Sequence, residues 1–128
     1  MEKCNILIVD DILMNRILLK ELIQEIPCET KEAKNGLEAV EILKTSKIDI
    51  VLMDIEMPKM NGLEATRYIR HKLPSPLNSV PIIALTAHNP NDFFEDFSSV
   101  GFNDLLTKPY SFEKVIDAIK LYSKYVFK

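Results

Sequence analysis

The sequence is poor in the residues that build structural metal sites. It has two cysteines, Cys4 and Cys28, and two histidines, His71 and His88. Two cysteines without a suitable histidine cluster do not make a structural zinc site, and two histidines do not make a histidine-rich one. Both cysteines stand at the start of predicted strands, so their thiols could lie near each other. In a reducing compartment both are expected to remain thiols.

Long hydrophobic runs and an excess of basic charge are also missing. No apolar stretch approaches the roughly 18 residues that a membrane-spanning helix needs. The first three residues lead directly into a predicted strand, which leaves no room for a signal peptide, so we expect a cytoplasmic protein. The formal net charge of −3 provides no basic surface field, and direct binding to nucleic acid is not expected.

The chain of 128 residues is 47% hydrophobic and 27% charged, which predicts one domain over residues 1–128. Apolar runs that predict strands alternate with segments of helical spacing. The predicted strands span 5–9, 28–33, 48–53, 80–85 and 104–107, and the predicted helices span 12–26, 37–43, 63–71, 91–100 and 112–125. Five such units predict an α/β fold, an open parallel sheet with helices on both faces.

Charged and hydroxyl residues stand where the predicted strands end. Asp10 and Asp11 follow the first strand, and Asp54 follows the third. Thr86 follows the fourth strand, and Lys108 follows the fifth. The carboxyl ends of parallel strands share one edge of a sheet, where ligands bind. Three carboxylates gathered there repel one another, so the site is complete only with a cation and an anion.

The chemistry of these side chains favours phosphoryl transfer with a metal ion. Carboxylate oxygens suit Mg²⁺, and the carboxylate of Asp54 can attack a phosphoryl group to form an acyl phosphate. Lys108 can pair with one phosphoryl oxygen, and the Thr86 hydroxyl can bond to another. Each residue alone has a simpler interpretation. The Asp10–Asp11 pair or Thr86 could cap a helix, and Lys108 could be an ordinary surface lysine.

Five motifs in order extend across nearly the whole chain. They are ILIVDD at 6–11, NGLEA at 35–39, LMDIEMPKMNG at 52–62, PIIALTA at 81–87 and LTKP at 106–109. In these motifs the sequence resembles a receiver domain of two-component response regulators. The resemblance implies the flavodoxin-like fold, with a five-stranded parallel sheet in the order 2-1-3-4-5. It also implies a phosphoacceptor signalling module, which is not an enzyme beyond gaining and losing its own phosphoryl group.

The resemblance implies roles for the acidic residues. Asp54 would accept a phosphoryl group from a phosphohistidine on a histidine kinase or a histidine phosphotransfer protein. Asp11 would bind Mg²⁺ directly, Asp10 mainly through water, and Glu56 through its backbone carbonyl. His88 and Glu56 stand at positions that, by resemblance, influence how fast water removes the phosphoryl group.

The resemblance also implies a switch, in which this sequence departs from the family. Lys108 would hold the phosphoryl group, and Thr86, followed by Ala87, would move toward it. Three residues before the lysine the family usually has an aromatic residue, but here that residue is Leu105. Leu105 is either simple core or the mark of a domain that passes the phosphoryl group on without a large change of shape. We favour the second interpretation.

Two helices carry candidate partner surfaces. A repeat at intervals of four predicts the sheet-facing side of the first helix, namely Met14, Leu18, Leu22 and Ile26. Leu13 and Ile17 lie off that side. They either contact a neighbouring helix or form an exposed pair that docks the phosphodonor. Phe94 in the fourth helix points away from two phenylalanines expected in the core. It is either an isolated surface aromatic or a partner contact, including a weak homodimer.

Other functions remain open. A Mg²⁺-dependent phosphohydrolase with an aspartyl-phosphate intermediate would use Glu56 as its second acid. A flavin-binding module would need a loop rich in Ser, Thr and Gly after the first strand, where residues 10–13 are DDIL. An inert receiver that serves only as an interaction domain would not need Asp10, Asp11 and Asp54, and the presence of all three argues against it. Within the receiver class, the chain could be a single-domain regulator, a relay intermediate or part of a hybrid histidine kinase.

Overall fold

The structure of the protein is a computed structural model that describes residues 4–57, 59–87, 99–109 and 111–122. In chain order the elements are β1 (Cys4–Val9), α1 (Leu13–Ile23), β2 (Cys28–Ala33), α2 (Gly36–Thr45), β3 (Ile50–Asp54), α3 (Gly62–Lys72), the 3-10 turn η1 (Leu77–Ser79), β4 (Ile82–Thr86), β5 (Asp104–Thr107) and α5 (Phe112–Tyr122). The predicted helix over 91–100, including Phe94, lies outside the described residues apart from its last two.

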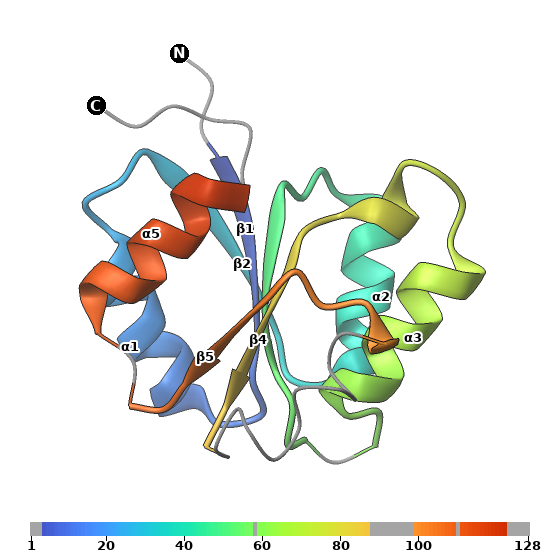
Figure 1. Cartoon of the computed structure of the whole chain (residues 1–128), viewed down its shortest axis with the longest axis horizontal. Helices are drawn as coiled ribbons and strands as arrows, with labels where there is room; N and C mark the ends of the chain where they lie inside the picture. The colour runs from blue at the N-terminus through green and yellow to red at the C-terminus, as the bar shows by residue number, and fades with distance from the viewer. Residues whose placement is uncertain (1–3, 58, 88–98, 110, 123–128) are drawn as a thin grey trace.

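The strands form one parallel sheet in the order β2-β1-β3-β4-β5. Helices α1 and α5 cover one face of the sheet, and α2 and α3 cover the other (Figure 1). This arrangement confirms the predicted fold. Among the described residues, no helix is both long enough and apolar enough to cross a bilayer. Cys4 and Cys28 are partners in the register of β1 and β2, so they lie near each other as their positions suggested, and both are thiols.

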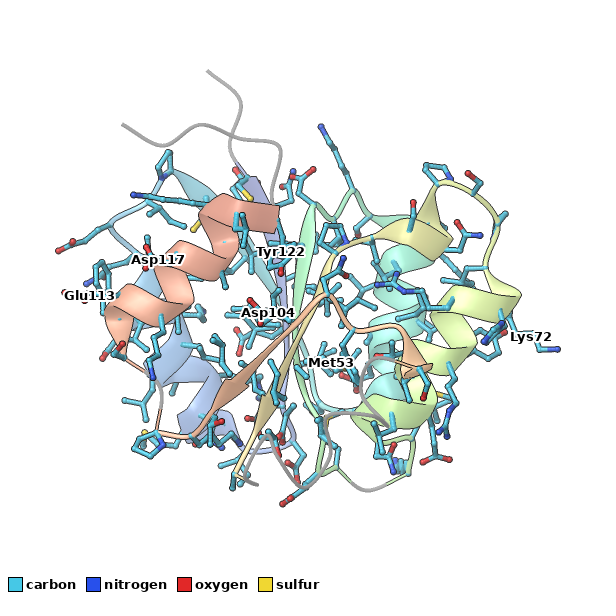
Figure 2. All side chains as sticks on the ribbon, in the orientation of Figure 1. Met53, Lys72, Asp104, Glu113, Asp117 and Tyr122 are labelled. Atoms are coloured by element: carbon cyan, nitrogen blue, oxygen red, sulfur yellow. The ribbon has the colours of Figure 1, made fainter. Side chains whose placement is uncertain are left out.

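Two apolar layers hold the helices against the sheet, and β1 supplies both. Ile6 and Ile8 belong to the layer under α1 and α5, whereas Leu7 and Val9 belong to the layer under α2 and α3. Met53 of β3 lies in this second layer (Figure 2). Successive strand residues point to opposite faces, so a strand covered on both sides is apolar without interruption.

The predicted sheet-facing side of α1 is wrong. Met14 is 60% exposed and Leu18 is 50% exposed, and Leu22 is only partly buried. Ile26 is buried, but it lies beyond the end of α1 at Ile23. The buried residues of α1 are Arg16, Leu19 and Ile23. The error has a physical cause: seven of the eleven positions of this helix are apolar, and the buried side contains a cation, which hydropathy assigns to solvent.

The turn into α3 brings the backbone close to the end of β3. Asn61 begins α3 with a capping box, in which its side chain and that of Glu64 each accept a hydrogen bond from the other's backbone N–H. The backbone N–H of Gly62 then donates to the carbonyl of Ile55 at 3.0 Å. A Cβ atom at Gly62 would lie 2.5 Å from the backbone oxygen of Asp54. Gly62 therefore permits α3 to begin directly beside Asp54.

Candidate functional site

The strand ends bring the predicted site residues together. Asp54 is the last residue of β3, Thr86 is the last of β4, and Lys108 follows β5. The backbone N–H of Lys108 donates to the carbonyl of Thr86 at 2.7 Å, which holds these two strand ends side by side. Asp10, Asp11 and Asp54 each place a carboxylate oxygen within 4.8 Å of the other two. We call these three residues the acidic cluster.

Lys108 is the cation that faces the acidic cluster. Its Nζ lies 3.2 Å from Oδ1 of Asp54 and 3.8 Å from Oδ2 of Asp10. One ammonium group therefore contacts two of the three carboxylates, and the cluster keeps an excess of negative charge. The peptide bond between Lys108 and Pro109 is cis. These two contacts show that Lys108 is not an ordinary surface lysine.

Asp54 is held where ionisation is costly. The side chain is 5% exposed, and burial together with the charge of Asp10 raises its pKa from 3.8 to about 6. The ammonium of Lys108 and a backbone hydrogen bond from Glu56 act in the opposite direction. A buried carboxylate with a raised pKa beside a like charge is typical of a functional site.

One carboxylate oxygen of Asp10 lacks a hydrogen bond. Its Oδ1 accepts from the backbone N–H of Ile12 at 2.9 Å and from the amide of Asn15 at 3.4 Å. Its Oδ2 is buried and has no hydrogen-bond partner among the described residues, although Lys108 Nζ lies 3.8 Å away. An unsatisfied buried carboxylate oxygen is costly. Helix α1 begins at Leu13 after Ile12 as N-cap, so Asp10 and Asp11 do not cap this helix.

The acidic cluster can hold a divalent cation. It offers the hard oxygen ligands that Mg²⁺, Mn²⁺ and Ca²⁺ prefer. Asp10 and Asp54 are buried, whereas Asp11 is exposed, so the cluster has a solvent-facing side. A cation would also satisfy the buried Oδ2 of Asp10. The donor set and the unsatisfied oxygen both fit such an ion.

The predicted switch residues lie at the same edge of the sheet. Thr86 is fully buried at the end of β4, and Ala87 after it is exposed. Leu105 is partly buried and packs, together with Leu63 and Phe102, on a small cluster that contains Ile55 and Ala84. Glu56 is exposed. His88 and the helix that Thr86 was considered to cap lie outside the described residues.

One contact to the site was not predicted. The guanidinium of Arg16 donates from Nη1 to the backbone oxygen of Asp10 at 2.8 Å. Hydropathy could not find this contact, because a charged residue near the start of a helix is normally assigned to solvent.

The predicted pair on α1 is exposed. Leu13 is 58% exposed and Ile17 is 38% exposed, so both side chains are accessible to a partner. Elsewhere on α1, Leu18 lines a groove of about 620 Å³ together with Phe112 and Lys108. Ile17 lines a different groove, together with Cys28 and Thr30.

Known proteins are similar to this chain in sequence and in fold. The family model of the response regulator receiver domain matches residues 6–120. The polar-differentiation response regulator DivK of Brucella anthropi is 33% identical over 118 residues, which are 92% of this chain and 94% of that protein.

Solved structures agree with this match. The receiver domain of a sensor histidine kinase from Pseudomonas aeruginosa, solved with a magnesium ion in its active-site cleft, superposes with a TM-score of 0.84 at 28% identity, over 94% of this chain and 98% of that one. The chemotaxis protein CheY4 of Vibrio cholerae superposes with a TM-score of 0.85 at 24% identity, over 94% of this chain and 99% of that one, which supports the fold alone. The chain therefore belongs to the response regulator receiver domain family, the signalling domains of two-component systems.

Proposed function

We propose that Asp54 is the phosphoacceptor of this receiver domain. The proposal rests on one observation: the Asp54 carboxylate ends β3 within reach of two further carboxylates and lies 3.2 Å from the Lys108 ammonium. The donor would be a phosphohistidine on a histidine kinase or a histidine phosphotransfer protein. We further infer that the chain acts in the cytoplasm as one domain over residues 1–128.

The transfer is a substitution at phosphorus. A carboxylate oxygen of Asp54 forms the new P–O bond, the P–N bond of the phosphohistidine breaks, and its electron pair goes to the imidazole, which then takes a proton from solvent. The Lys108 ammonium would move from Asp54 Oδ1 to a phosphoryl oxygen. The Thr86 hydroxyl would donate to another, and Ala87 would move with it. These groups act by position and charge, as phosphoryl transfer requires.

We propose Mg²⁺ as the cofactor. Asp10, Asp11, Asp54 and the backbone carbonyl of Glu56 would hold it. When bound, the ion would offset the negative charge of the carboxylates and of the transferring phosphoryl oxygens. The choice of Mg²⁺ is supported by the oxygen donors of the acidic cluster and by the magnesium ion in the similar Pseudomonas receiver domain.

We propose that Leu13 and Ile17 dock the phosphodonor. Both are exposed apolar residues on α1, and α1 begins two residues after Asp11. A groove on the same helix, lined by Leu18, reaches Lys108. A donor helix lying on this surface would present its histidine near Asp54. The relatives include both a response regulator and receiver domains of histidine kinases. The docking surface therefore suits a separate regulator as well as a receiver domain within a histidine kinase.

We propose that the domain relays its phosphoryl group. Leu105 replaces the aromatic residue of the usual switch, and its side chain packs with Leu63 on the small cluster of Ile55 and Ala84. A leucine lacks the aromatic ring that, by the family resemblance, rotates inward as Thr86 moves. The phosphohydrolase alternative is not favoured, because the family match extends over residues 6–120.

The test of the phosphoacceptor is labelling from radioactive acetyl phosphate with Mg²⁺. Asp54→Asn should abolish incorporation, because an amide does not form a stable acyl phosphate. The matched control is Asp117→Asn, which changes an exposed aspartate on α5 (Figure 2) and should label like the unchanged protein. Label that persists in Asp54→Asn at another residue would overturn the assignment.

A further inference from the structure

The side of α1 that faces the sheet contains an arginine. Arg16 is buried, with 8% of its side chain exposed, although Leu19 and Ile23 on the same side are apolar. Burial of a cation costs free energy unless hydrogen bonds and opposite charge compensate for it. A buried arginine in this position must therefore be held by specific partners.

Arg16 has two partners, one on each side. Its Nε donates to Oε1 of Glu32 in β2 at 2.9 Å, and its Nη1 donates to the backbone oxygen of Asp10 at 2.8 Å. The second carboxylate oxygen of Glu32 accepts from Lys20 at 3.1 Å. The hydrogen bond from Arg16 is the main reason why the pKa of Glu32 is lowered. Glu32 thus anchors the guanidinium as a carboxylate.

These contacts form a closed ring around the backbone of Asp10. The N–H of Asp10 donates to the carbonyl of Ala33 at 3.1 Å, and Ala33 follows Glu32 directly in β2. The carbonyl of Asp10 is bonded to Arg16, which returns to Glu32. Both backbone polar groups of Asp10 are therefore fixed, one by β2 and one by α1.

The ring also fixes the backbone positions from which two carboxylate side chains extend. The carbonyl that Arg16 holds belongs to the peptide group between Asp10 and Asp11, and this group is planar. Its orientation sets the Cα positions of both residues. Asp10 and Asp11 each place a carboxylate oxygen within 4.8 Å of one on Asp54.

We propose that Arg16, anchored by Glu32, is a positioning residue for the divalent-cation site. It holds the peptide between Asp10 and Asp11 so that both carboxylates present oxygens to the same ion as Asp54. Arg16 does not contact the ion; it acts through the ligands, as partners outside the ligand shell do in metal sites generally. The inference rests on the proposed function only in requiring that the acidic cluster binds a cation.

The test is the affinity for Mg²⁺ itself, measured without phosphorylation. Backbone amide shifts in NMR spectra are followed during titration of the full chain with MgCl₂. Arg16→Met removes every donor and keeps the aliphatic length, and its dissociation constant should rise by about 10-fold, the lower end for such partners. Arg16→Lys keeps a cation and should recover part of this loss. Lys44→Met removes an exposed ion pair with Glu41 on α2 and should leave the affinity unchanged.

A second variant covers the case in which Arg16→Met does not fold. Glu32 is partly exposed, so Glu32→Leu should fold, and it should weaken Mg²⁺ binding several-fold because the guanidinium loses its anchor. Urea unfolding of each variant separates a loss of stability from a loss of affinity.

A folded Arg16→Met or Glu32→Leu protein with a dissociation constant within about 2-fold of the unchanged chain would overturn the positioning role. An unchanged chain that is labelled at Asp54 but binds no Mg²⁺ would overturn it as well. Absence of labelling at Asp54, with Mg²⁺ binding intact, would contradict only the phosphoacceptor assignment.

Discussion

Asp54 combines two properties that oppose each other in a folded protein. It is buried beside Asp10, which makes its negative charge costly, and it must be ionised to act as a nucleophile. Lys108 recovers part of the cost through its 3.2 Å contact. A bound cation would recover more. The site is therefore destabilising by itself and becomes favourable only with its ligands, which is a common property of functional sites.

This opposition predicts how Asp54 affects stability in the metal-free protein. Its pKa is raised from 3.8 to about 6 on folding, so its contribution to stability is fully present below the unfolded pKa and is lost as pH rises through about 6. Asp54→Asn should therefore raise the free energy of unfolding at pH 7 by about 1–2 kcal/mol, after allowance for the lost contact with Lys108.

The measurement is urea unfolding of both proteins with excess chelator at pH 7 and at pH 4. The gain from Asp54→Asn should shrink at the lower pH, because the carboxyl group is then mostly protonated when folded. Asp117→Asn on α5 serves as the control, since its side chain is exposed. A gain of the same size at both pH values would show that the Asp54 charge is not the cause.

At the scale of the element, α1 serves two surfaces at once. Its inner side, with Leu19 and Ile23, packs on the sheet, and Arg16 on that side holds the loop before the helix. Its outer side exposes five large apolar residues, counting the N-cap residue: Ile12, Leu13, Met14, Ile17 and Leu18. Exposed apolar groups gathered on one helix mark an interaction surface more than a folding requirement.

This surface predicts a donor-specific defect. Leu13→Ala combined with Ile17→Ala should slow phosphoryl transfer from the cognate phosphohistidine protein by roughly 10-fold, since truncation of a central contact costs about 1–2 kcal/mol. Labelling by acetyl phosphate should not change, because the acidic cluster and Lys108 remain intact. Transfer rates with the two donors are compared.

The control for the docking surface is Leu37→Ala. Leu37 is 51% exposed and lies on α2, which covers the opposite face of the sheet from α1. It should transfer at the unchanged rate with both donors. An equal loss with both donors in the Leu13→Ala, Ile17→Ala protein would remove the docking role and indicate damage to the site.

At the scale of the whole molecule, the sheet order decides that the site exists. Strands β1 and β3 are neighbours and β4 follows β3, so residues 10, 54 and 86, which are far apart in the sequence, end at one edge. The helices lie on the faces (Figure 1) and leave the carboxyl edge to the loops. Binding of a cation there should therefore stabilise the entire fold.

That coupling is measurable as a shift in unfolding. Mg²⁺ at 100 times its dissociation constant should raise the free energy of unfolding by about 2.7 kcal/mol, because a ligand that binds only the folded state stabilises it by mass action. The same ionic strength supplied as KCl is the control for screening. A free energy of unfolding that Mg²⁺ raises no more than KCl does at the same ionic strength would count against a cation in the acidic cluster.

Much of the fold could be predicted because local patterns and the fold agree. The run at 5–9 is apolar without interruption because both faces of β1 are covered. The helix predicted over 63–71 is α3, which spans Gly62–Lys72. The orientation of α1 could not be predicted, because its apolar residues surround the helix and its buried side includes Arg16. The end of α1 at Ile23, before Pro27, depends likewise on tertiary packing.

The identities of the strand-ending residues, and hence the chemistry of the site, were determined by the sequence alone, since apolar runs that stop at Asp10, Asp54, Thr86 and Lys108 need no coordinates to be found. The tertiary structure decided what those residues experience. The burial that raises the pKa of Asp54, the Asp10 oxygen without a hydrogen bond and the ring through Arg16 all arise from the packing of separate elements against one another. Desolvation and hydrogen-bond geometry depend on which groups become neighbours, and a one-dimensional pattern does not contain that information.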